Sequence, residues 1–277
     1  MEPAVLDRHG GGGMSRTIAK VLRPVGIEPP QRTVAPSSVT PLKPANRLRR
    51  RVRRGETLFG AGDPFGTLFV VQGGHFKCLA TSPNGQVQVT GFPMVADVLG
   101  LDGIDTGFHQ CDVVAFDSAE VFVLPFAECE QWSRDTANGQ RLMRRMLARE
   151  ITRGHDHMLL LSATRAEQRV AIFLLDLSER YRRMGESRSR FALRMTRQDI
   201  GSYLGLQLET VSRLLSHFQR EGFLQVQGRE IALLDFPVLW RLSGHTPDTH
   251  RPMVEPILDL QGNLVHVADP DDGRTRM

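Results

Sequence analysis

The sequence is poor in several residue types, and each shortage excludes a class of protein. Only three cysteines occur among the 277 residues, Cys78, Cys111 and Cys129, and no two of them form a C-x-x-C pair. This count predicts neither a disulfide framework nor a metal site of the usual cysteine spacing. No apolar run approaches the roughly 18 residues that a membrane helix needs, and no charged segment followed by an apolar run opens the chain as in a secretory signal. These absences predict a cytoplasmic protein.

Lysine is also scarce, since three of the 35 basic residues are lysines, and the charge is unevenly distributed. Residues 1–54 carry a net charge of +9, residues 55–164 carry −6, residues 165–244 carry +4 and residues 245–277 carry −3, which gives +4 overall. An acidic middle segment beside a basic later one predicts a sensor or partner module joined to a module that binds a polyanion.

Residues 1–47 are predicted to be a disordered leader, because they hold the run Gly10–Gly13, six prolines from Pro24 to Pro44 and no apolar period. Met14 is an alternative start. The leader runs into Arg47–Arg54, which has six arginines in eight positions. Two interpretations stay open for this run, a contact to phosphate groups or a solvated edge before a strand.

Between Gly55 and Phe126 the pattern is one of short β-strands separated by turns, with Asn84-Gly85 at the centre of one hairpin. Such spacing predicts a small β-roll in a domain at residues 48–136. The long helices that an α/β enzyme places between its strands are missing. Paired carboxylates at a plausible spacing, a G-x-S-x-G motif and a phosphate loop are missing too, so we do not expect an enzyme.

A long helix is predicted at residues 137–165, where no proline occurs. One apolar stripe steps by four and three residues through Leu147, Ile151, Gly154, Met158 and Leu161. This heptad spacing predicts a dimerisation seam, although a helix packed on its own β-roll would also need one stripe. A second apolar stripe (Leu142, Met146, with Met143 beside it) gives the helix more apolar surface than packing on its own β-roll would cover. We therefore favour a coiled-coil dimer.

Residues 196–216 predict two short helices that cross closely. Thr196, followed three residues later by Asp199, resembles a capping box. Gly201 is small where the helices meet, and Gly205 suits a left-handed turn between them. Gln207 begins the second helix, whose inner face is expected to hold Leu208, Val211, Leu214 or Leu215, and Phe218. This is the helix-turn-helix pattern, in which the second helix enters the DNA major groove with its N-terminal end.

The expected outer face of the second helix carries side chains suited to reading bases. Arg213 can pair with guanine, Glu209 can accept a hydrogen bond from cytosine, and Ser212 can contact either base edges or a thymine methyl group. A solvated salt bridge between Glu209 and Arg213 is the alternative. The expected DNA-binding residues are Glu209, Ser212, Arg213, Thr196, Arg197, Thr210, Ser216 and Arg229.

Residues 222–234 read as a strand, a Gly228-Arg229 turn and a second strand, which predicts a wing that brings Arg229 near phosphate. The expected fold class is therefore α+β. A β-roll of the cyclic-nucleotide-binding type is followed by a long dimerisation helix, and a winged helix-turn-helix domain occupies residues 166–244. Residues 245–277 are expected to be a weakly ordered tail, with a short hairpin at residues 257–265 as the alternative.

This order of segments resembles the CRP/FNR family of bacterial transcription regulators, and its FNR-type members most. The resemblance covers about residues 48–244 and is specific along Met158–Ser162, Met195–Gly201, Tyr203–Leu206 and Glu209–Leu215. The arrangement Glu209-x-x-Ser212-Arg213 implies palindromic operators with TTGAT-like half-sites. The family also implies a homodimer on double-stranded DNA, an activator rather than a repressor, that contacts RNA polymerase through exposed β-roll turns such as Asn84–Gln86.

Two departures from the family bear on cofactors. FNR-type members bind an iron–sulfur cluster through N-terminal cysteines and one in the β-roll, whereas here residues 1–77 have no cysteine and Phe122 stands at the β-roll position. Three cysteines so placed cannot hold a cluster. Cyclic-nucleotide members hold the phosphate with a β-roll arginine, which the stretch Phe108–Asp112 lacks. Nearby carboxylates would repel a phosphate, so cyclic AMP is not expected either; these are Asp102, Asp105 and Asp112.

Few residues remain for sensing a signal. His109 is a candidate haem ligand, and Cys78 and Cys111 are candidate redox thiols, each against the alternative of a surface or packed residue. The rival functions are a small-molecule sensor for haem, a nucleotide or a redox signal whose DNA binding is ligand-gated, and a partner subunit that does not bind DNA.

Overall fold

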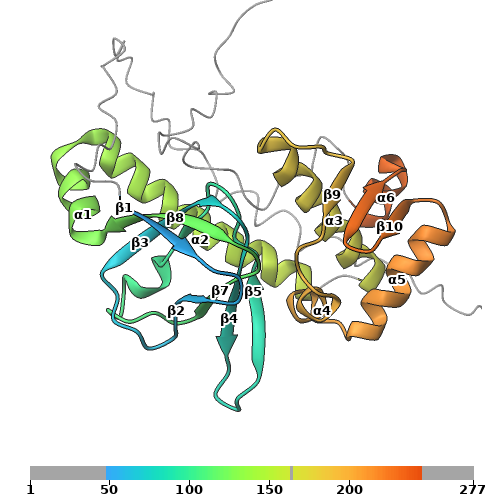
Figure 1. Cartoon of the computed structure of the whole chain (residues 1–277), viewed down its shortest axis with the longest axis horizontal. Helices are drawn as coiled ribbons and strands as arrows, with labels where there is room; N and C mark the ends of the chain where they lie inside the picture. The colour runs from blue at the N-terminus through green and yellow to red at the C-terminus, as the bar shows by residue number, and fades with distance from the viewer. Residues whose placement is uncertain (1–47, 163–164, 245–277) are drawn as a thin grey trace, which may run out of the picture. The chain divides into compact units, whose positions relative to one another are not determined.

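The computed structural model describes residues 48–162 and 165–244 (Figure 1). The predicted leader, the alternative start at Met14, the tail and the hairpin at residues 257–265 lie outside the described residues. None of the described helices is long and apolar enough to span a membrane.

Two antiparallel four-stranded sheets form the predicted β-roll. The first has the order β1-β8-β3-β6, and the second has the order β2-β7-β4-β5. The strands are β1 (Leu48–Val52), β2 (Thr57–Phe59), β3 (Thr67–Gly73), β4 (Phe76–Thr81), β5 (Val87–Gly91), β6 (Val98–Leu99), β7 (Asp112–Ala115) and β8 (Ala119–Pro125). The arginine run thus contains a strand, rather than only preceding one, because all five residues of β1 pair with β8 at the edge of the sheet.

Strand β3 shows how the roll and the helices share a core. Its side chains alternate between the two faces of the sheet. Phe69 and Val71 pack between the two sheets, whereas Leu68 and Val70 pack outward, on the side of the helices. Both faces are buried, which explains why this strand is continuously apolar in sequence.

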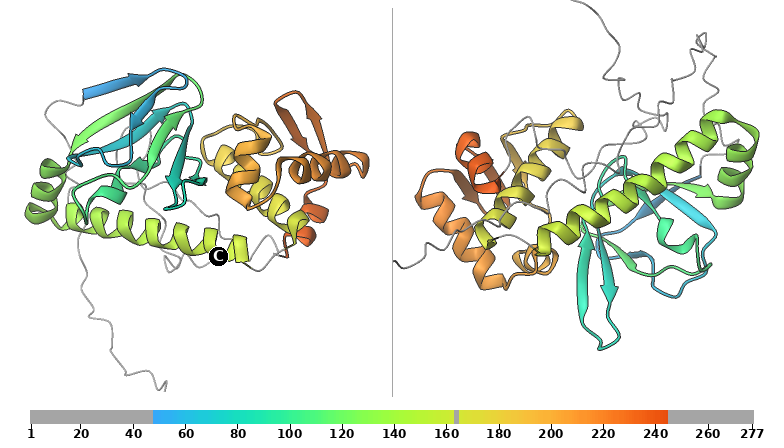
Figure 2. Two further views of the ribbon diagram at one scale, coloured as in Figure 1. Left: turned by 90° about the horizontal axis from the view of Figure 1, so that it is seen from below. Right: turned by 180° about the vertical axis from the view of Figure 1, so that it is seen from behind.

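The helical segment after the roll is divided in two. Helix α1 (Phe126–Asp135) ends at Thr136, whose hydroxyl accepts a hydrogen bond from the Gly139 N–H at the start of α2 (Ala137–Ser162). Leu142 and Met146 of α2 are buried against the roll, as the second apolar stripe predicted. Figure 2 shows α2 running along the roll.

The C-terminal part is a winged helix-turn-helix. Its core helix α3 (Ala166–Arg183) is buried over most of its length. Around it lie α4 (Arg197–Leu204), α5 (Leu208–Arg220), α6 (Phe236–Ser243) and the sheet β10-β11-β9, formed by β10 (Leu224–Gln227), β11 (Glu230–Leu233) and β9 (Arg190–Ala192). The predicted α+β fold class is confirmed.

Candidate nucleic-acid interface

The turn between α4 and α5 is built by local signals that the sequence carries. The Thr196 hydroxyl accepts a hydrogen bond from Asp199 N at 3.0 Å, and the Asp199 carboxylate accepts one from Thr196 N at 3.0 Å, so the capping box is complete. Gly205 ends α4 with φ 62° and ψ 39°, a left-handed conformation that favours glycine. Leu206 N then donates to the Gly201 carbonyl at 2.8 Å and sets the angle at which α5 leaves the turn.

Gly201 is required by this turn, and we expect Gly201→Ala to destabilise the chain by about 1–3 kcal/mol, the usual cost of overpacking. A Cβ atom there would lie 2.6 Å from the backbone carbonyl oxygen of Leu206, which cannot move away without opening the turn. Urea unfolding measures the change. The matched control is Gly154→Ala, also within a helix, where a Cβ meets nothing within 4 Å and helix propensity predicts a gain of up to about 1 kcal/mol. Equal stability of the two variants would contradict the prediction.

Helix α5 buries one side and exposes the other. Val211, Leu215 and Phe218 are buried, and Leu214 is half-buried, as predicted. The prediction that Leu208 faces inward is wrong: this residue is 42% exposed, at the first position of the helix.

The exposed face of α5 carries the residues predicted to read bases. Glu209 and Arg213 are exposed, and within the described ranges no ion pair or hydrogen bond joins them. The salt-bridge alternative therefore lacks support, and both side chains are available for an external partner. Ser216 is exposed as well, whereas Thr210 and Ser212 are half-buried beside them.

The remaining predicted DNA contacts surround this helix. Arg229 is exposed in the turn of the β10–β11 wing, where Gly228 has φ 62°. Arg197 is half-buried at the start of α4, and burial lowers its pKa. The Thr196 hydroxyl also donates to the Asp199 carboxylate at 2.6 Å, so this hydroxyl already serves as the helix cap.

A contact between the roll and α4 was not foreseen from the sequence. Lys77 of β4 donates to the Asp199 carboxylate at 2.8 Å, and Val89 N of β5 donates to the Ser202 hydroxyl at 2.8 Å. Burial acts to raise the pKa of Asp199, but hydrogen bonds from Lys77 and Thr196 outweigh it, so the pKa lies below its ordinary value. The partners are more than a hundred residues apart in the chain. The one feature of the sequence that could have drawn attention to Lys77 is that lysine is rare in this chain.

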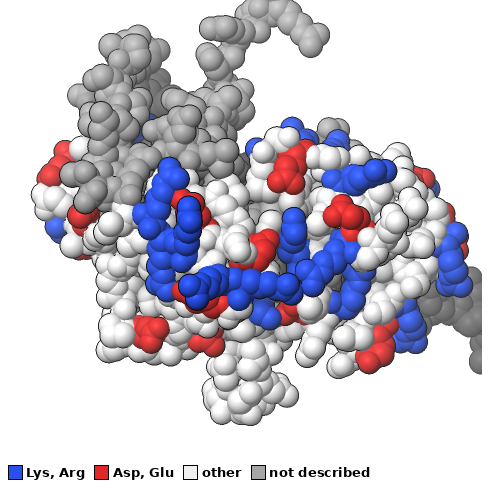
Figure 3. All heavy atoms as spheres, viewed as in Figure 1, with Lys and Arg blue, Asp and Glu red and all other residues white. Residues whose placement is uncertain are grey.

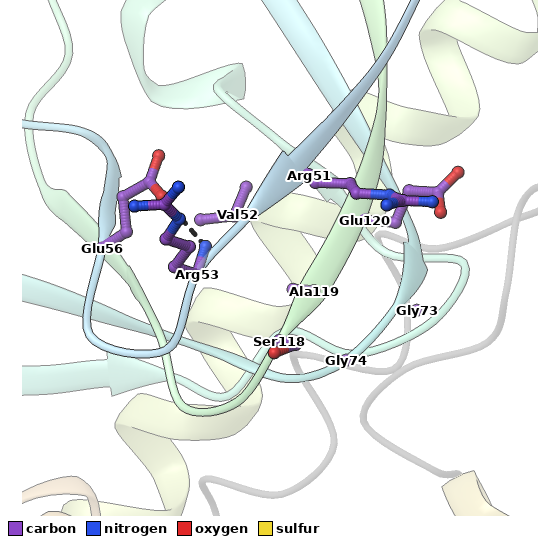
Figure 4. A pocket seen from close by; sticks show the side chains of 9 residues that line it. All are labelled: Arg51, Val52, Arg53, Glu56, Gly73, Gly74, Ser118, Ala119 and Glu120. Atoms are coloured by element: carbon purple, nitrogen blue, oxygen red, sulfur yellow. Dashed lines mark hydrogen bonds between the residues drawn. The ribbon is translucent and has the colours of Figure 1, made fainter.

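The arginine run at the start of the roll is partly neutralised by acidic residues. Arg49 and Arg50 form salt bridges to Glu120 and Glu56 at 3.0 and 3.2 Å. Figure 3 shows basic side chains in a band on this view of the molecule, with acidic side chains among them. Arg51 and Arg53 point away from each other beside an open hollow of about 890 Å³ (Figure 4). These pairs favour the solvated edge, and a contact of the other arginines of the run to phosphate stays a prediction.

The predicted dimerisation stripe of α2 is largely uncovered. Leu147 is 37% exposed, Ile151 is 61% exposed and Met158 is 59% exposed, while Gly154 is open to its surroundings. Leu161 is half-buried and lies near the Gly205 turn, so it is partly used within the chain. Leu159, 62% exposed, adds apolar surface that the heptad pattern missed.

The candidate cofactor residues occupy different surroundings. His109 is buried, its ring stacks on Phe59 at 3.8 Å between centroids, and its Nδ1 lies 3.3 Å from an Asp102 carboxylate oxygen. This arrangement is that of a packed residue. No group of three or more His, Cys, Asp or Glu side chains suited to a metal ion occurs in the part of the chain that the structure describes.

Comparison with protein families matches both halves of the described chain. A Cyclic nucleotide-binding domain model matches residues 49–135, and a Crp-like helix-turn-helix domain model matches residues 168–242. The transcriptional regulatory protein btr of Bordetella pertussis is 43% identical over 196 residues, which cover 71% of this chain and 81% of that protein. The transcriptional activator protein anr of Pseudomonas aeruginosa is 38% identical over 195 residues, which cover 70% and 80%.

A third relative and a solved structure agree with these matches. The fumarate and nitrate reduction regulatory protein of Escherichia coli is 38% identical over 198 residues, covering 72% of this chain and 79% of that protein. The structure of FixK2 from Bradyrhizobium japonicum has 31% identity and a TM-score of 0.66, and it covers 73% of this chain and 99% of that one. The chain therefore belongs to the CRP/FNR family of DNA-binding transcription regulators.

Proposed function

We propose that the protein binds palindromic DNA with TTGAT-like half-sites as a homodimer. The observation that carries this proposal is the pair Glu209 and Arg213, exposed on the first turns of α5 and not joined to each other by any interaction in the described ranges. With Ser212 between them, these side chains suit the readout of cytosine, guanine and thymine edges. In a dimer, two such helices about 34 Å apart would enter successive major grooves.

Binding of fluorescent duplexes tests the half-site. A duplex with two TTGAT half-sites in opposite orientation should bind about a thousandfold tighter than a scrambled duplex of the same length, within the usual range for specific recognition. A duplex in which one half-site is replaced distinguishes binding as a dimer from binding as a monomer. A dimer should lose most of its affinity for this duplex, because one of its two recognition helices has no half-site to bind. Equal binding to the palindrome and the scrambled duplex at physiological salt would refute the proposal.

The stripe on α2 supports the dimer, and we expect Gly154→Asp to weaken self-association. The change places a carboxylate in the predicted seam, where it would face the same carboxylate of the second copy. Sedimentation velocity over a range of concentrations measures the shift toward monomer. Thr152→Asp is the control, since it adds the same charge at an exposed position of the same helix outside the stripe. An unaltered sedimentation profile for Gly154→Asp would contradict the seam.

We propose that the regulator acts in the cytoplasm as an activator and contacts RNA polymerase through the β4–β5 hairpin. Residues Pro83–Val87 at its tip are exposed, and Val87 is 58% exposed. The relative anr is named an activator. In a reconstituted transcription assay, Asn84→Asp should lower activation while leaving DNA affinity unchanged.

We also propose that neither an iron–sulfur cluster nor cyclic AMP is the signal, and that the chain carries out no catalytic step. Two of its three thiols lie in the roll and the third is buried in α1, so they do not form a set of cluster ligands. The one arginine that lines the cavity of the roll, Arg153, is bound to Asp97 at 3.0 Å. Carboxylates of Asp102 and Glu150 line the same cavity, which disfavours a phosphate. An absorbance scan of protein purified without oxygen and a titration with cyclic AMP test both points.

A further inference from the structure

A cavity of about 400 Å³ lies between the roll and α2. Strands β4, β5 and β7 and the segment at residues 98–102 supply one wall, and α2 supplies the other. The ionisable and sulfur-bearing side chains of its lining are Cys78, Asp102, Cys111, Glu150, Arg153 and His157.

Two thiols share the wall of this cavity because of the strand register. Cys78 of β4 lies opposite Val113 of β7. Cys111 precedes Val113 by two residues, so both thiols project from the same face of the sheet as diagonal neighbours. On its other side Cys78 pairs with Gly91 of β5, which has no side chain to cover the sulfur. Both cysteines are half-buried and neither forms a disulfide.

The surroundings of Cys111 keep its thiol protonated. The neighbouring Cys78 thiol is the main reason why the pKa of Cys111 is raised, and burial and the Asp102 carboxylate raise it further. The Cys111 thiol donates to Asp102 Oδ2 at 3.5 Å. Divalent metal ions require thiolates and further ligands, and the described residues offer no third ligand grouped with this pair. Oxidation also begins with attack by a thiolate on the oxidant, so a pair that includes the protonated Cys111 thiol suits a reagent that reacts with neutral thiols.

We propose that Cys78 and Cys111 form a dithiol site that binds a trivalent arsenical through two sulfur–arsenic bonds. With an organic arsine oxide as reagent, each sulfur replaces one bond between arsenic and oxygen, and both thiol protons leave with that oxygen as one water molecule. Arsenic stays trivalent, so neither an oxidant nor a reductant is needed. The product adds no charge beside Asp102, and the organic group on arsenic occupies the cavity. This site does not depend on the DNA sequence that the protein reads.

Phenylarsine oxide added to the full-length protein tests the proposal. Intact-protein mass spectrometry should show one arsenical per chain with the loss of one water, and two of the three thiols should become inaccessible to a thiol reagent. Cys78→Ser and Cys111→Ser should each weaken binding by about 10²–10⁴-fold, since the second bond forms at high effective concentration. Cys129→Ser is the control, because its thiol is buried in α1 and stands alone. Unchanged binding by either single variant, or loss of binding by Cys129→Ser, would overturn the site.

A variant that retains both thiols tests whether a loss of arsenical binding could result from misfolding rather than from loss of a sulfur ligand. A Cβ at Gly91 lies 4.0 Å from the Cys78 sulfur, which is an ordinary contact, so the backbone tolerates a side chain there. The methyl groups of Gly91→Val extend over the thiol, and we expect weaker arsenical binding with an unchanged thermal unfolding transition. Release of the arsenical by a dithiol but not by excess monothiol supports two bonds. Full release by the monothiol, or full-strength binding by Gly91→Val, contradicts them.

Discussion

Arg213→Ala should remove discrimination at one guanine–cytosine pair in each half-site and leave non-specific DNA binding nearly intact. A bidentate contact from arginine to guanine contributes about 1–3 kcal/mol of discrimination, and a dimer makes it twice. Affinity for the palindrome should therefore fall by about a hundredfold or more. Because Arg213 is exposed and pairs with no described residue, its removal leaves no internal group without a partner, and stability should stay within about 0.5 kcal/mol. The loss of DNA affinity can therefore be measured without a loss of folding stability.

The measurement is a binding profile over every single-base change of one half-site. In the wild type, replacing the recognised guanine should lower the DNA affinity as much as removing the Arg213 side chain does. In Arg213→Ala, duplexes with any of the four bases at that position should bind with the same affinity. The base preferences at the other positions should be unchanged. Arg220→Ala is the matched control, since Arg220 is also exposed on α5 but lies in its last turn. It removes the same charge and should leave the base profile intact. A profile unchanged by Arg213→Ala would remove this residue from base recognition.

The parts of the interface that the sequence predicted are those governed by neighbouring residues. Thr196 and Asp199 are three positions apart, and Gly205 supplies its own backbone conformation, so the capping box and the turn depend on local chemistry. The heptad stripe on α2 is likewise a property of one helix. Leu208 shows the limit of this reasoning: a periodic pattern gives the side of the helix on which a residue lies, but not how far other elements cover it at the end of the helix.

The contacts between distant segments could not be predicted in this way. Lys77 and Asp199 are 122 residues apart, and Arg180 and Asp97 are 83 residues apart. Each such pair is one among many possible combinations of charges. Cys78 and Cys111 became a pair only when the register of β4 and β7 was known, since a shift of one residue would place them on opposite faces.

Asp97 connects three elements that the sequence does not relate. It lies in the loop between β5 and β6, next to Ala96, which holds φ 72°. Its carboxylate accepts hydrogen bonds from Arg153 of α2 at 3.0 Å and from Arg180 of α3 at 2.6 Å. Asp97 and Arg180 are buried, so their charges are only weakly solvated. One carboxylate therefore joins the roll to the long helix and to the core helix of the DNA-binding part.

Asp97→Asn should cost about 3–5 kcal/mol of unfolding free energy, because it leaves the buried Arg180 guanidinium without its counter-charge. In a chain of this size the melting temperature should fall by about 10 °C. Denaturant unfolding followed by tryptophan fluorescence measures the loss, with Asp105→Asn as the control at an exposed position, where the change should stay within about 0.5 kcal/mol.

The two tryptophans of the chain allow a sharper form of this experiment. Trp132 lies in α1 beside the roll, and Trp240 lies in α6 of the DNA-binding part. Variants that retain one tryptophan each should unfold at the same denaturant concentration while Asp97 joins the parts. With Asp97→Asn the two transitions should separate, since the link between the roll and α3 is weakened. If Asp97→Asn shifts both unfolding midpoints together, and by less than Asp105→Asn does, then Asp97 adds little to the coupling of the two parts. In that case the buried contact between Phe92 of the roll and Tyr203 of α4 must hold the parts together instead.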